Sequence, residues 1–68
     1  MNNNTIFNTG DIITHKDSDN TNPYYYIVIN RFNKYQHEYY NLFCLTEWAE
    51  RTLRMDNQKH YRVVSSVS

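Results

Sequence analysis

Three histidines and one cysteine are the residues of this 68-residue chain best suited to metal binding or nucleophilic chemistry. They are His15, His37, His60 and Cys44. A zinc site needs three or four converging ligands, and the sequence has neither a CxxC nor an HxxxH pair to start one. His37 and His60 also fall in segments that we predict as turns. We therefore interpret the histidines as surface residues and expect no metal site.

Cys44 stands between Phe43 and Leu45 in an apolar segment. A free cysteine in such surroundings usually packs as a small buried hydrophobe, and burial suppresses the reactivity of a thiol. The glutamates show no spacing that would pair two catalytic carboxylates, and a chain this short has little room for a substrate pocket. We therefore predict that the protein is not an enzyme and binds no cofactor.

Residues 17–22 begin like a calcium-binding loop, with Asp17 and Asp19 at its first and third positions. Such a loop needs glycine at position six and a bidentate glutamate at position twelve. Here those positions hold Asn22 and Val28. We predict a solvated loop of turn-forming residues instead of a calcium site.

Aromatic side chains are the main candidates for a binding function, since seven Tyr, three Phe and one Trp make up 16% of the chain. A domain of this size buries only about 60% of the surface of its unfolded chain, so some rings should lie outside the core. The alternative is that the rings complete the core with their hydroxyls in water. Tyr, Trp and Arg are enriched at interface hot spots. The predicted partner-binding residues are Tyr24, Arg31, Tyr35, Tyr39, Trp48 and Arg54.

The charge balance separates two hypotheses about the partner. Seven basic and seven acidic residues give a net charge of zero, which provides no long-range attraction to a polyanion. Binding to another protein is therefore our first hypothesis. The alternative is a nucleic-acid-binding small barrel, in which aromatic rings stack on bases while Arg and Lys follow the phosphates. A third hypothesis is a homodimer formed through an exposed strand edge.

The elements that position these residues are predicted to be strands, because β-branched and aromatic residues are abundant while Ala and Leu are scarce. We expect strands over residues 12–16, 24–32, 38–46 and 61–66. Residues 24–46 should form a central hairpin with a loop of four or five residues. The segment around 47–55 allows either a short helix or a turn followed by a short strand. Residues 1–5 are expected to be flexible, and 6–68 to form one domain.

Four segments together resemble SH3-like small barrels, including uncharacterised phage proteins of that type. They are Gly10-Asp11-Ile12-Ile13, residues 25–29 (YYIVI), residues 40–45 (YNLFCL) and residues 61–65 (YRVVS). The resemblance covers residues 7–66. It implies a mainly β fold of five strands closed into a barrel.

The same resemblance implies a binding module, and specifically a phage-encoded inhibitor or modulator that binds a larger host protein. Residues 1–10 carry no secretory signal, and no apolar run approaches the roughly 20 residues of a membrane span. We therefore expect a cytoplasmic protein that does not contact a membrane.

Overall fold

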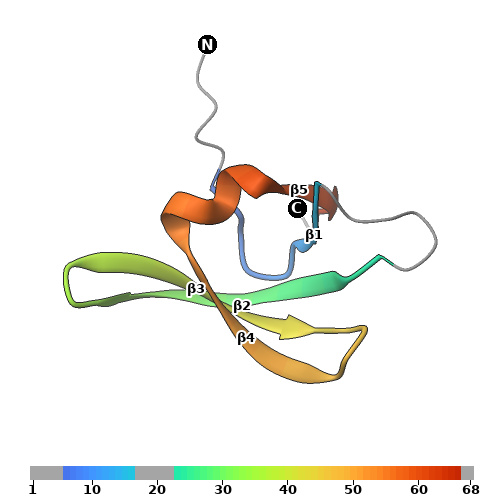
Figure 1. Ribbon diagram of the computed structural model, residues 1–68, viewed down its shortest axis with the longest axis horizontal. Coiled ribbons are helices and arrows are strands. Elements are labelled where there is room, and N and C mark those ends of the chain that lie inside the picture. Colours follow the sequence, from blue (N-terminus) through green and yellow to red (C-terminus); the bar gives the residue numbers. More distant parts are fainter. Residues whose placement is uncertain (1–5, 17–22, 67–68) are drawn as a thin grey trace, which may run out of the picture.

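A computed structural model describes residues 6–16 and 23–66, which form five antiparallel strands and one short 3-10 helix (Figure 1). The strands are β1 (Ile12–His15), β2 (Tyr25–Lys34), β3 (His37–Cys44), β4 (Ala49–Arg54) and β5 (Tyr61–Ser65), and the 3-10 helix is η1 (Met55–His60). The prediction of a mainly β chain is confirmed. The predictions for residues 1–5 and for the loop at 17–22 lie outside the described residues.

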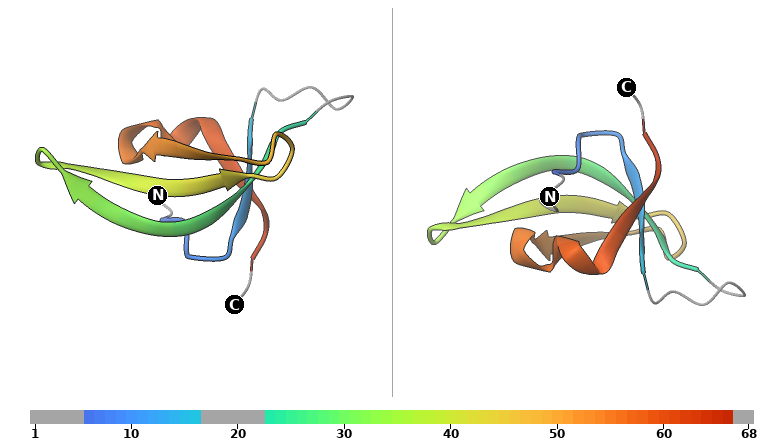
Figure 2. Two further views of the ribbon diagram at one scale, coloured as in Figure 1. Left: turned by 90° about the horizontal axis from the view of Figure 1, so that it is seen from below. Right: turned by 90° about the horizontal axis from the view of Figure 1, so that it is seen from above.

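The five strands form one sheet in the order β4-β3-β2-β1-β5. Within the described residues no backbone pairing joins β4 to β5, so the prediction of a closed barrel is wrong. The chain passes from β4 to β5 through η1, which lies between these two edge strands in sequence, and Figure 2 shows β1 and β5 crossing the direction of β2, β3 and β4 steeply. The helix η1 connects β4 to β5 and contacts β3, β4 and β5. This side of the core is therefore covered by side chains of η1 and not by a strand ladder.

The central hairpin is confirmed, but its turn is tighter than predicted. Lys34 still pairs with His37, so the loop consists of Tyr35 and Gln36 alone. Their φ angles are 52° and 67°, which are the values of a type I′ turn. The twist of this turn matches that of the two strands it joins, so the pairing continues to the tip.

For residues 47–55, the strand alternative is confirmed. Residues 45–48 form a turn, and β4 then pairs with β3 from Cys44 and Ala49 to Tyr39 and Arg54. In β4 the buried Leu53 lies between exposed neighbours, as expected for a strand with one covered face. Helical structure in this region begins only at Met55 and takes the 3-10 form.

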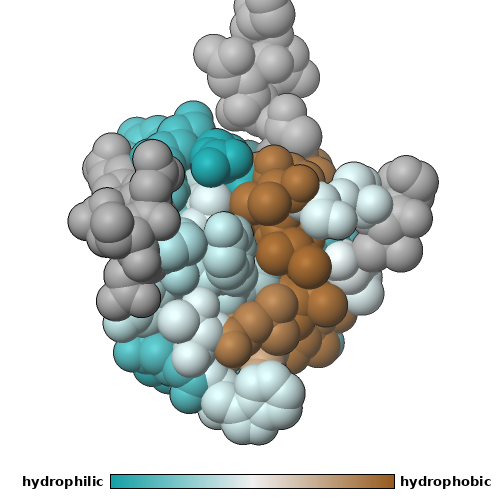
Figure 3. All heavy atoms as spheres, turned by 90° about the vertical axis from the view of Figure 1, so that its right-hand side faces the viewer, coloured by the Kyte–Doolittle hydropathy of each residue, from teal (hydrophilic) through white to brown (hydrophobic). Residues whose placement is uncertain are grey.

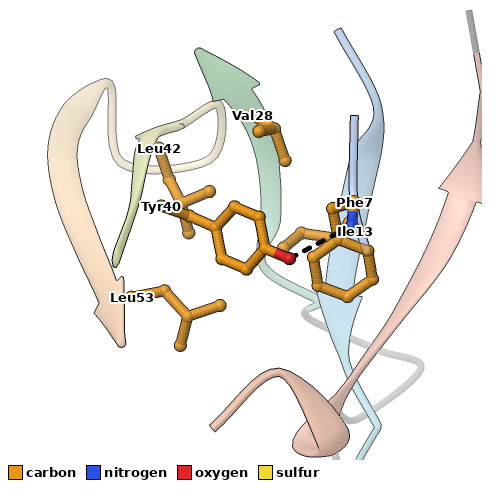
Figure 4. Close-up of a cluster of buried hydrophobic side chains, with 6 residues drawn as sticks. All are labelled: Phe7, Ile13, Val28, Tyr40, Leu42 and Leu53. Carbon is orange, nitrogen blue, oxygen red and sulfur yellow. Dashed lines mark hydrogen bonds between the residues drawn. The ribbon is translucent and has the colours of Figure 1, made fainter. Parts of the chain in front are cut away.

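The core is centred on Tyr40, which is 0% exposed (Figure 4). Its hydroxyl accepts a hydrogen bond from the backbone N–H of Phe7 at 3.2 Å and donates one to Gln58 Oε1. Buried apolar side chains from the N-terminal segment and from four strands surround it. They are Phe7, Ile13, Val28, Leu42 and Leu53.

Cys44 is also 0% exposed, which confirms its predicted burial. Its Sγ accepts a hydrogen bond from the backbone N–H of Glu47 at 3.3 Å. The thiol thus helps to hold the turn between β3 and β4.

Burial raises the pKa of three tyrosine hydroxyls, Tyr26, Tyr40 and Tyr61, above the ordinary value. In each case the folded state binds the proton more tightly than the unfolded chain. The resulting stability is fully present below pH of about 10 and is lost as the pH rises through the folded pKa values. We expect the unfolding temperature, measured by circular dichroism, to fall as the pH rises above about 10. Replacing Tyr26 and Tyr61 by Phe should flatten this decline, and an equally steep decline in that variant would contradict the assignment.

Candidate binding face

The side chains of β2, β3 and β4 that point away from the core form a surface that we call the outer face. Cross-strand partners lie on the same side of a sheet, so the pairing registers identify its members. Tyr39 is opposite Phe32 on one side and Arg54 on the other, and Phe43 is opposite Glu50. The members used below are Asn30, Phe32, Lys34, His37, Tyr39, Asn41, Phe43, Glu50, Thr52 and Arg54.

Three rings gather where the central hairpin ends, and we call Phe32, Tyr35 and Tyr39 the tip cluster. The rings of Phe32 and Tyr39 are stacked, with centroids 5.4 Å apart and planes 15° apart. Lys34 Nζ lies 5.4 Å from the centroid of the Tyr35 ring. These four side chains and Thr52 line a hollow of about 240 Å³. The hollow offers apolar walls and one cationic group to a ligand side chain.

Two further rings lie at the opposite end of β3, and we call Phe43 and Trp48 the base cluster. They meet edge to face with centroids 5.1 Å apart. Phe43 continues an apolar row across the sheet, since it pairs with Ile27 and Ile27 pairs with Ile12. Figure 3 looks onto this side of the molecule and shows a band of apolar side chains.

Tyr35 and Trp48 combine high exposure with an unfavourable backbone. They are 81% and 76% exposed, the largest values among the exposed large hydrophobic side chains of the described residues. Their φ angles are 52° and 59°. A left-handed conformation costs a residue with a Cβ roughly 1–2 kcal/mol, which glycine avoids. Folding alone would favour Gly or Asn at both positions, so these two rings are not explained by the stability of the fold.

The predicted site residues do not form one cluster. Tyr35, Tyr39 and Arg54 meet at the tip, whereas Trp48 lies at the base. Tyr24 is also near the base, where its hydroxyl donates a hydrogen bond to Glu47 Oε2 at 3.3 Å. The sixth predicted residue, Arg31, lies on the opposite side of the hairpin.

Arg31 pairs with Tyr40 and therefore lies on the side of the sheet that faces the core. A bulge between Val28 and Asn30 reverses the alternation of β2, and the sequence contains no signal for it. Lys34, Phe43 and Thr52 also belong to the face but were not among the predicted partner-binding residues. Strict alternation along β3 from the buried Cys44 could have indicated Phe43.

Charges on this face are arranged by sign. At the tip, Arg54 pairs with Asp56 at 3.1 Å and lies 3.4 Å from His37 Nδ1, while Lys34 adds a further positive charge. Near the base, Arg51 pairs with Glu47 at 2.7 Å, although Arg51 is opposite the buried Leu42 and so belongs to the other side of β4. Glu50, opposite Phe43, adds a negative charge there. Each ion pair is neutral, so the tip has an excess of positive charge and the base an excess of negative charge.

Two of the three histidines meet, away from this face. The rings of His15 and His60 stack with centroids 6.1 Å apart, and Tyr61 contacts His15 edge to face. Across residues 6–16 and 23–66, no three His, Cys, Asp or Glu side chains are grouped as metal ligands. No helix in the same residues has the length and apolar character needed to cross a membrane.

No protein-family model matches this chain, and neither a curated protein nor a solved structure matches it significantly. The function of the outer face must therefore be inferred from its own residues.

Proposed function

We propose that this protein is a non-enzymatic binding module whose outer face contacts another protein. The observation that carries the proposal is the placement of Tyr35 and Trp48, two large exposed rings held at positive φ. Residues in strained backbone conformations cluster at functional sites. The stacked pair of Phe32 and Tyr39 lies between these two rings and extends the apolar surface.

A protein partner fits the charges of this face better than a polyanion does. A nucleic-acid backbone that crossed the face from tip to base would approach the carboxylate of Glu50. The positive charge of Arg54 is already partly neutralised by Asp56. The second candidate remains a nucleic-acid-binding role, which is favoured by the stacked rings of the tip cluster beside Lys34.

The strongly bent sheet of five antiparallel strands is compatible with the SH3-like resemblance of the sequence. The proposal extends that resemblance to a small phage-type inhibitor or modulator, which acts by covering part of a larger host protein in the cytoplasm. A chain of this size can block a surface without catalytic groups of its own.

The test is affinity capture from a nuclease-treated lysate of the host cell. We expect one protein partner to be retained, and Tyr39→Ala to lower its affinity at least tenfold, as removal of a hot-spot ring does. Arg31→Ala is the matched control, because Arg31 lies on the same hairpin but on the other side, and it should retain the partner. Two results would refute the proposal. One is retention of nucleic acid alone with a steep salt dependence, and the other is equal loss in both variants.

A further inference from the structure

The excess charges of the outer face lie near opposite corners of it. Lys34 is on β2 at the level of His37, and Glu50 is on β4 at the level of Phe43. These levels are six residues apart on β3, or about 20 Å at the rise of an extended strand. The face therefore has one positive end and one negative end, separated by the length of the hairpin.

We infer that a second copy of this chain binds the outer face, forming a two-fold dimer in which Lys34 of each copy faces Glu50 of the other. The two-fold axis lies between the two faces, perpendicular to the line from Lys34 to Glu50. It passes over β3 at the level of Tyr40, between the outward-facing Tyr39 and Asn41. Rotation about this axis exchanges the two ends, so that the tip of one copy covers the base of its partner. Such an interface uses the same patch twice and closes after two copies.

The rings of the face fit this arrangement. The tip cluster of one copy would cover the base cluster of the other, and both rings at positive φ, Tyr35 and Trp48, would become buried. Two sheets packed face to face are about 10 Å apart, which leaves room for aromatic side chains to interdigitate. The dimer thus accounts for the exposed rings at both ends, whereas a small ligand at the tip would leave Trp48 uncovered.

The row of side chains on the base side of the centre is polar and uncharged. Asn41 pairs with Asn30 on one side and with Thr52 on the other. These side chains lie close to the proposed axis, where each residue meets its own copy. An amide carries both donors and an acceptor, so it can hydrogen-bond to an identical amide. Arg54 lies as near to the axis on the tip side of the centre, where its charge is paired with that of Asp56.

The charge pattern selects a second copy as the occupant. An arrangement that placed tip over tip would bring Lys34 against Lys34, while tip over base brings opposite charges together twice. The chain as a whole has zero net charge, so no overall repulsion opposes association. This inference uses the face of the proposed function but does not depend on it, because an outside partner would compete for the same surface.

The experiment is sedimentation equilibrium of the purified chain over a range of concentrations. We expect reversible dimers that weaken as salt is added. K34E and E50K should each weaken dimerisation on the order of tenfold, because each substitution alters two symmetry-related contacts. Both residues are on the exposed surface, and circular dichroism of each variant verifies that it is folded. A wild-type chain that stays monomeric would overturn the inference, while leaving an outside partner free to be found.

Mixing the two variants gives the sharpest result. K34E has two acidic ends and E50K has two basic ends, so an equimolar mixture should regain the affinity that each variant lost. The double variant K34E/E50K should also dimerise, because its reversed ends are again complementary. A mixture and a double variant that associate no better than the single variants would show that these charges do not face each other, and the inference would be wrong.

Discussion

Tyr40→Phe should lower the free energy of unfolding by about 2 kcal/mol, although it removes one oxygen atom and leaves the ring in place. The hydroxyl accepts a hydrogen bond from the Phe7 N–H and donates one to Gln58. Without it, a buried N–H has no acceptor, which costs about 1–3 kcal/mol. In a domain of this size, the unfolding temperature should fall by roughly 10 °C.

The effect is large because this hydroxyl joins three parts of the chain. Phe7 precedes β1, Tyr40 is in the middle of β3, and Gln58 is in η1. Among the described residues no backbone hydrogen bond joins η1 to the segment around Phe7, and the hydroxyl of Tyr40 bridges the two. Loss of the hydroxyl should therefore loosen η1 and the N-terminal segment together.

Tyr39→Phe is the matched control, because Tyr39 directly precedes Tyr40 on β3 and faces outward. We expect that variant to unfold within about 0.5 kcal/mol of the wild type, as surface substitutions usually do. Tyr40→Ala should cost about 3–5 kcal/mol and leave little folded protein. Thermal and urea unfolding measure all three. Equal stabilities of Tyr40→Phe and Tyr39→Phe would show that the hydroxyl does not support the fold.

Composition and local pattern were sufficient to predict four of the five strands, while the segment of β4 stayed open between helix and strand. The run from Tyr24 to Phe32 and the run from Glu38 to Thr46 are rich in β-branched and aromatic residues, and polar residues separate them. The same pattern placed Cys44 in the core, between two large apolar neighbours. These predictions depend on residue type within a short segment, which is the property that a sequence displays directly.

The features that were missed depend on the backbone or on distant segments. The bulge between Val28 and Asn30 moves Arg31 to the other side of the hairpin, and no residue type there signals it. The tight turn has Tyr35 and Gln36 where Asn-Gly is typical, so a longer loop was predicted. The barrel stays open because β4 and β5 remain the two edges of the sheet with η1 between them in the chain, an arrangement that only the packed structure reveals.

The turn at the tip of the hairpin gives the most informative prediction about function, because stability and binding should change in opposite directions. Tyr35→Asn combined with Gln36→Gly places the preferred type I′ sequence in a turn that already has that geometry. Relief of strain at two residues should outweigh the loss of the contact between Lys34 and the Tyr35 ring. We expect the free energy of unfolding to rise by about 1–2 kcal/mol.

The same variant should bind its partner, and its own second copy, at least tenfold more weakly, because the most exposed ring of the face is gone. If the variant is more stable than the wild type, unfolding cannot be the cause of its weaker binding. An alanine substitution that destabilised this small domain would leave that explanation open.

Trp48→Gly is the comparison at the other turn. It also relieves a positive φ, but it loses the packing of the indole on Phe43, worth about 0.5–1.5 kcal/mol, so its stability should change less. A Tyr35→Asn/Gln36→Gly chain that is less stable than the wild type would show that the turn is not strained. A variant that is more stable and binds equally well would show that the Tyr35 ring lies outside the interface. In that case, binding would not explain why a less stable turn sequence is present at the tip.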